Sequence, residues 1–155
     1  MKGIFAACAA AGMALAAASC ATSPAPARVP VQPGWIAPAE AIQRAAEAAP
    51  SGVPGIFAMH VQATGTQDGY AYLNSELDYR DQRNLTVAIS PNAAKAMEAK
   101  LGVSPLDYYK GKDILVHGSA YRTKISITMG HRYTGKYYYQ THVRVADPAQ
   151  VEVRR

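Results

Sequence analysis

The feature that most restricts the fold is one long stretch of alternating residues, Asp113–Met129. Alternation of apolar and polar side chains predicts a β-strand with one buried face. Ile114 and Val116 are even-numbered, whereas Ile125 and Ile127 are odd-numbered, so the apolar phase shifts by one residue along the stretch. Such a shift inverts the two faces of a strand, and we therefore expect a bulge or sharp bend near Gly118.

Other periodic segments surround this strand. Three strands are predicted before it, then a helix that begins at Pro91 after the N-cap Ser90 and ends at Gly102. One strand is predicted after it. The expected strands are Ile56–Thr64, Tyr70–Ser75, Leu85–Ile89, Asp113–Met129 and Lys136–Val145. Three strands, a helix and two strands is the order of the OB-fold, a mainly β, five-stranded Greek-key barrel with one helix between strands three and four. A generic α+β sandwich is the alternative.

The chain before the predicted barrel divides into three parts. Residues 1–19 contain Lys2 and then an uncharged, alanine-rich apolar run, which is typical of a signal peptide. Residues 20–37 are rich in proline and alanine and predict a disordered tether. Residues 38–54 predict a short helix, which begins at Pro38, and a linker. Residues 55–155 remain for the barrel domain.

The end of the signal segment, Ala17-Ala18-Ser19-Cys20, resembles the bacterial lipobox. That resemblance implies that Cys20 carries a lipid anchor, although Ala17 stands where leucine or valine is usual. Ala21, rather than aspartate, follows the cysteine, which in Gram-negative lipoproteins implies the outer membrane, facing the periplasm. Cleavage without lipidation, which releases a soluble periplasmic protein, is the alternative.

Two stretches carry a resemblance to a family. GKDILVHGSAYR, residues 111–122, resembles a strand of OB-folds in nucleic-acid-binding domains. YLNSELDYRDQRNLTVAI, residues 72–89, and the closing VRVADPAQVEV resemble small stand-alone OB-fold domains of exported bacterial proteins. The resemblance implies the fold more than a function, because one fold hosts many functions.

The C-terminal part of the chain is basic. Residues 110–155 carry nine basic and three acidic side chains, hence a net charge of +6. Tyrosines interleave with these bases, and tyrosine stacking with arginine–phosphate contacts is how OB-folds bind single strands. We expect Arg122, Lys124, Arg132, Lys136 and Arg144 to form one positive surface on the last hairpin. The predicted ligand-binding residues are Tyr72, Tyr79, Arg80, Arg83, Tyr121, Arg122, Lys124, Arg132, Lys136, Tyr138 and Arg144.

Catalytic and metal sites are not predicted. The charged segment from Glu76 to Arg83 allows a metal-assisted phosphodiesterase loop with Asp78, Asp81 and Arg80, or a hairpin held together by its own Asp–Arg pairs. The four histidines show no short ligand spacing, so we expect no metal, and nothing predicts a cofactor. Hydrophobic residues make up 49% of the chain, which excludes a fully disordered protein. Two cysteines exclude a disulfide scaffold.

These observations predict a non-enzymatic, membrane-tethered binding module in the periplasm. The module is expected to be non-enzymatic because its basic hairpin contains no catalytic constellation. Its expected partner is a protein, a glycan or another anionic polymer, because the hairpin is positively charged. A single-stranded nucleic-acid binder is the first alternative and the phosphodiesterase is the second. The identity of the partner does not follow from the residues.

Overall fold

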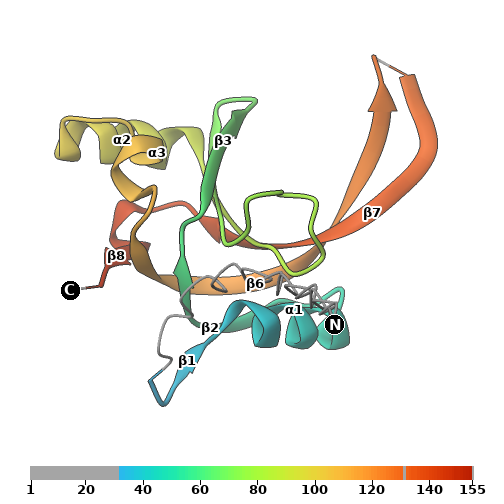
Figure 1. Ribbon diagram of the computed structural model, residues 1–155, viewed down its shortest axis with the longest axis horizontal. Helices are drawn as coiled ribbons and strands as arrows, with labels where there is room; N and C mark the ends of the chain where they lie inside the picture. The colour runs from blue at the N-terminus through green and yellow to red at the C-terminus, as the bar shows by residue number, and fades with distance from the viewer. Residues whose placement is uncertain (1–31, 131, 155) are drawn as a thin grey trace, which may run out of the picture.

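The computed structural model describes residues 32–130 and 132–154. The expected signal peptide, Cys20 and most of the expected tether lie outside the described residues. The described chain is mainly β (Figure 1). Its elements are β1 Trp35–Ile36, α1 Pro38–Ala48, β2 Val53–His60, β3 Ala63–Gln67, β4 Tyr70–Asn74, β5 Leu85–Ile89, α2 Pro91–Leu101, α3 Pro105–Tyr109, β6 Asp113–Met129, β7 Arg132–Val145, a 3₁₀ turn Pro148–Gln150 and β8 Val151–Val153.

The strands form one mixed sheet with the order β1-β2-β6-β7-β5-β4-β3, and β8 pairs with β6. β5 and β7 run parallel, as do β1 and β2, whereas the other neighbours are antiparallel. The described strands therefore number eight, in contrast to the five expected. Of the additional strands, β1 is too short to show a periodic pattern in the sequence, whereas β8 coincides with the short extended piece that Val151 and Val153 suggest.

The third additional strand arises because the predicted strand Ile56–Thr64 is divided. β2 pairs with β6 and β3 pairs with β4. Between them, the Val61 amide donates to the carbonyl of Lys112 at 2.9 Å, and the Gln62 amide donates to the carbonyl of Asn74 at 2.9 Å. The backbone thus changes its hydrogen-bonding partner within two residues, a tertiary effect that the alternating pattern does not record.

The central elements follow the sequence closely. All five residues of β5 are buried, so Thr86 and Ala88 are buried in addition to Leu85, Val87 and Ile89, which alternation predicts to face inward. The Ser90 hydroxyl accepts a hydrogen bond from the amide of Ala93, and Gly102 ends α2 with a left-handed φ of 74°. Both caps agree with the sequence prediction.

The N-terminal residues contribute to the core more than the sequence predicts. Ala41 and Ala45 of α1 are fully buried against the sheet, with Phe57 and Leu73 in the same core. Ile36 of β1 is also buried, so the expected disordered tether of residues 20–37 is wrong at Trp35–Ile36. Among the described residues, no helix combines the length and the apolar character that a membrane crossing needs.

The expected bulge near Gly118 is also wrong. The pairing of β6 runs without interruption through Gly118 opposite Gly55, and Ala120 continues the buried phase of Val116. The register shift lies between Ser126 and Thr128, in the part of β6 and β7 that projects from the sheet as a two-stranded ribbon (Figure 1). Ile125 and Ile127 lie on that ribbon, outside the core, and so no face inversion is needed.

Candidate functional site

The outer face of the sheet carries the largest gathering of predicted site residues. The pairing places Tyr72 of β4 beside Ala88 of β5 and Ala88 beside Arg144 of β7. The next row joins Thr86, His142 and Tyr121. Paired residues project from the same face of a sheet, so Tyr72, Arg144 and Tyr121 face the same side. We call this surface the outer face.

Aromatic rings and one cation define the outer face. The ring of Tyr72 lies 6.1 Å from that of Tyr70 with the planes 23° apart, and 6.3 Å from the imidazole of His142. The guanidinium of Arg144 lies 5.3 Å from the centre of the Tyr121 ring. Arg144 is exposed and has no carboxylate within ion-pair distance among the described residues. Its charge is therefore available to an anion.

A hydrogen-bond network connects the outer face to the loop of residues 76–84. The side-chain amide of Gln140 donates to the carbonyl of Tyr79 at 3.1 Å and to the hydroxyl of Tyr138 at 3.0 Å. Its Oε1 is left to accept from Nε2 of His142 at 2.7 Å. This arrangement requires a proton on Nε2 of a neutral His142. Burial, with the nearby Arg144, lowers the pKa of His142 to about 4, so the imidazole is neutral at pH 7.

Buried amides and hydroxyls anchor the same loop. The side-chain amide of Asn84 donates to Asn74, to Thr86 and to the carbonyl of Tyr79, and its oxygen accepts from the amide of Glu76 at 3.1 Å. Asn84 is 2% exposed. The loop therefore has a fixed base beside the outer face, where it lies in the middle of the view in Figure 1.

The charges of the loop neutralise one another at its surface. Arg80 pairs with Asp78 at 3.2 Å and Arg83 pairs with Asp81 at 2.7 Å. Hydrogen bonds from Arg83 lower the pKa of Asp81 to about 2, and the backbone and side chain of Arg80 lower that of Asp78. Each of the two aspartates has its own arginine two residues away. These contacts favour the hairpin interpretation of the loop over the phosphodiesterase interpretation.

The expected single positive surface of the last hairpin is divided between two faces. Arg122 of β6 pairs with the buried Thr141, so it projects from the face that continues the core, opposite to Arg144. There Arg122 lies 3.9 Å from the centre of the Tyr139 ring. Lys124 lies 4.1 Å from the centre of the Tyr137 ring on the same side. Including Arg144 in this surface was wrong, because alternation along each strand does not give the register between strands.

The remaining predicted bases lie far along the ribbon. Arg132 pairs with Met129 near its end, and Lys136 lies in the irregular segment between Tyr133 and Tyr137. The structure therefore brings Tyr72, Tyr121, Tyr138 and Arg144 together with the loop residues Tyr79 and Arg80. It places Arg122, Lys124, Arg132 and Lys136 elsewhere, and Arg83 is held by Asp81 in the loop.

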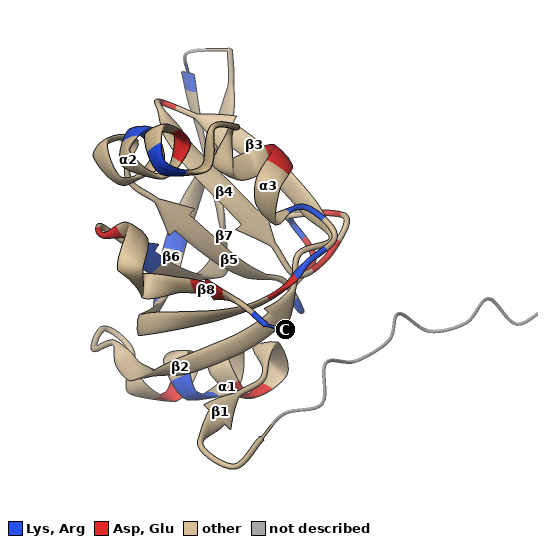
Figure 2. Ribbon diagram, turned by 90° about the vertical axis from the view of Figure 1, so that its left-hand side faces the viewer, with Lys and Arg blue, Asp and Glu red and all other residues tan. Residues whose placement is uncertain are grey.

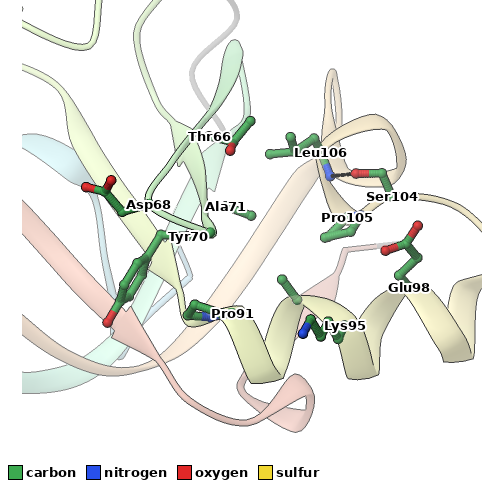
Figure 3. Close-up of a pocket in the computed structure, with 12 residues that line it drawn as sticks. Thr66, Asp68, Tyr70, Ala71, Pro91, Lys95, Glu98, Ser104, Pro105 and Leu106 are labelled. Atoms are coloured by element: carbon green, nitrogen blue, oxygen red, sulfur yellow. Dashed lines mark hydrogen bonds between the residues drawn. The ribbon is translucent and has the colours of Figure 1, made fainter.

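Two open grooves contain none of the predicted ligand-binding residues. One, of about 370 Å³, lies between the β3–β4 hairpin and the helices α2 and α3, where Pro91, Lys95 and Leu106 line it (Figure 3). The other, of about 500 Å³, contains His60 and Asp113, whose Nδ1 and Oδ1 lie 2.7 Å apart. The residues that line this second groove include no serine or cysteine that could act as a nucleophile with His60 and Asp113.

No cluster of three metal-ligating side chains occurs in residues 32–130 and 132–154. His60 contacts Asp113, His117 lies 3.5 Å from Glu152, and His142 contacts Gln140. The sequence prediction overlooked Tyr70, Gln140 and His142 as parts of the outer face. The alternation in β7, where Gln140, His142 and Arg144 share one face, was the signal that could have identified two of them.

Comparisons with known proteins identify no family. No protein-family model matches the chain, and no curated protein matches it. Among solved structures, a protein described as an aspartyl-tRNA synthetase from Leishmania major Friedlin is similar with a TM-score of 0.43 and 12% sequence identity. The similarity covers 85% of this chain but 22% of the synthetase chain, so this chain spans about a fifth of that protein.

Proposed function

We propose that this chain is a non-enzymatic binding module that holds an extended anionic polymer across the outer face. The observation that carries the proposal is Arg144, which lies beside the ring of Tyr121 in the same row as Tyr72 and has no carboxylate partner among the described residues. A polymer that passes over these residues finds a cation for its anionic groups and flat rings for its apolar parts. The loop of residues 76–84, which is fixed beside the outer face, places Tyr79 and Arg80 along one side of the proposed binding surface.

The proposed scaffold is an OB-type barrel. The argument for it treats β2 and β3 as one bent strand, since only Val61 and Gln62 separate them. That strand then pairs with β4 on one side and with β6 on the other, while β5 pairs in parallel with β7. The helix α2 follows the third strand of this set, which is the order expected for an OB-fold.

Single-stranded nucleic acid is the second candidate ligand. The observation in its favour is the pair of nearly parallel rings of Tyr70 and Tyr72, because base stacking on tyrosine is the usual way in which such modules hold a strand. Burial raises the pKa of Tyr72, so its phenol stays neutral at physiological pH. A glycan or polyphosphate would use Arg144 without needing the stacked rings.

The proposal is tested by fluorescence anisotropy of the full chain with two labelled probes, a short oligothymidylate and a polyphosphate, over a salt series. Tyr72→Ala should weaken oligothymidylate binding about 5- to 100-fold, because one stacked base contributes about 1–3 kcal/mol. Arg144→Gln should weaken the binding of both probes, because each needs a cation for its phosphates. Weakening of oligothymidylate binding alone by Tyr72→Ala would identify nucleic acid as the ligand. Absence of binding to both probes at low salt, where the electrostatic attraction between phosphates and basic side chains is strongest, would reject the proposal.

Arg122→Gln is the matched control for Arg144→Gln. It removes one positive charge from the same pair of strands, but on the opposite face. We expect it to change the affinity for either probe by less than about twofold, since a single exposed charge at a distance is screened by salt. Equal losses from the two variants would mean that overall charge, and not the outer face, is responsible for binding.

We also propose that the module is exported and tethered to the outer membrane through a lipid on Cys20. The support is the lipobox-like Ala17–Cys20 and the proline-rich segment after it. Cys20→Ser should move the protein from the detergent-soluble membrane fraction to the soluble periplasm, as measured by fractionation and blotting. A wild-type protein that is already soluble would instead support cleavage without lipidation.

A further inference from the structure

The far end of the β6–β7 ribbon exposes apolar side chains far from the outer face. Exposed fractions are 78% for Met129, 56% for Tyr133, 50% for Tyr137 and 41% for Ile127. The ribbon projects from the rest of the sheet (Figure 1), and the hydroxyl of Thr134 donates to the carbonyl of Ile127 at 2.7 Å across its irregular segment. We call the described residues 127–130 and 132–137 the ribbon tip.

The apolar character of the ribbon tip needs an explanation beyond the fold. Met129, paired with Arg132, projects from one face of the ribbon, whereas Tyr133 and Tyr137, paired with Thr128 and Ser126, project from the other. Scattered exposed apolar residues are ordinary, but an end of a ribbon that is apolar on both faces marks an interaction surface. Met129 and Tyr133 do not stabilise the hydrophobic core, because neither side chain packs against it. The proposed binding of a polymer at the outer face does not use them either.

The charge around the ribbon tip is of one sign. The sequence from Ile114 to Ala146 contains no aspartate or glutamate, and Lys124, Arg132 and Lys136 lie on or beside the tip. Figure 2 shows the projecting ribbon without acidic residues. An apolar end bordered by bases matches an anionic lipid surface, since tyrosine rings favour the headgroup level and lysine or arginine side chains approach the lipid phosphates.

We propose that the ribbon tip docks onto an anionic bilayer, with Met129 and Ile127 entering the boundary between headgroups and acyl chains. Lys124, Arg132 and Lys136 then contact the lipid phosphates. Nucleic acid is the less suitable occupant, because it offers no apolar phase for aliphatic side chains such as Ile127 and Met129. This second contact is independent of the lipid on Cys20 and of the polymer bound at the outer face.

The test places a tryptophan at the tip of the full chain. Met129→Trp and the control Val103→Trp, which is 47% exposed between α2 and α3, are each mixed with vesicles whose acyl chains carry bromine as a quencher. Trp35 and the apolar N-terminal segment are common to both variants and to the wild type, so differences between them report the new tryptophan. The emission of Met129→Trp should fall about twofold when phosphatidylglycerol vesicles are added, whereas the fractional decrease for Val103→Trp should equal that of the wild type.

Lys124→Gln, Arg132→Gln and Lys136→Gln together should weaken the docking to anionic vesicles about tenfold or more. Equal quenching of the two tryptophan variants, equal quenching by phosphatidylcholine vesicles, or release of the tip by an excess of oligothymidylate would each overturn the proposal. Arg144→Gln should leave the quenching unchanged. That variant separates a failure of the lipid contact from a failure of polymer binding at the outer face.

Discussion

Replacing Asn84 with alanine should lower the free energy of unfolding by about 2–4 kcal/mol, because it leaves buried polar groups without partners. Asn84 is 2% exposed, and its side chain bonds to Asn74, Thr86 and the backbone of Tyr79 and Glu76. The hydroxyl of Ser75 and the amide of Glu76 lose their acceptor in the variant. Urea denaturation followed by circular dichroism measures the change.

The matched control for Asn84→Ala lies one residue away. Arg83→Ala removes an exposed guanidinium whose partner, Asp81, is also at the surface of the loop. Exposed ion pairs contribute little, so this variant should remain within about 1 kcal/mol of the wild type. A loss as large as that of Asn84→Ala would show that surface charges, and not the buried amide, hold the loop.

Acidification from pH 7 to pH 4 should reduce the free energy of unfolding by at most about 3 kcal/mol through His142 alone. Burial lowers the pKa of its imidazole in the folded chain from 6.5 to about 4. The unfolded chain therefore takes up a proton first as the pH falls. The contribution is fully present above pH 6.5, declines as the pH drops towards 4, and changes no further below that.

His142→Gln should remove this part of the pH dependence while leaving a donor for Oε1 of Gln140. The measurement is the difference in unfolding free energy between wild type and variant, taken from denaturant curves at several pH values between 7 and 4. Asp81 contributes in a lower range, since its pKa falls from 3.8 to about 2. A difference that stays constant over the interval would contradict the neutral, buried state of His142.

Local order was predictable wherever the pattern of one segment decides the result. The strand Leu85–Ile89 and the helix beginning at Pro91 have the expected positions, because alternation within one strand and a pair of caps act over a few residues. Phe57, Met59 and Val61 are buried as alternation predicts. The excess of bases over acids after residue 110 was also a property of the sequence alone.

The site depends on contacts between distant segments. Alternation showed that Arg122 and Lys124 share one face of their strand and that Arg144 points away from Val143. Only the pairing of Arg122 with Thr141 and of Tyr121 with His142 decides that Arg144 lies on the opposite face from Arg122. A strand pattern has a period of two within one segment, whereas the register between two segments is set by their hydrogen bonds.

The sequence by itself determined the positions of the strand Leu85–Ile89 and of the helix that begins at Pro91, the burial of alternate residues such as Phe57 and Met59, and where positive charge accumulates. The tertiary structure decided that the first strand divides at Val61 and Gln62, that Trp35–Ile36 joins the sheet, and that Asn84 anchors a loop across Asn74 and Thr86. The physical reason is the range of the interactions. Propensity, capping and alternation act between near neighbours, whereas partner choice, register and buried polar networks arise only when distant segments pack together.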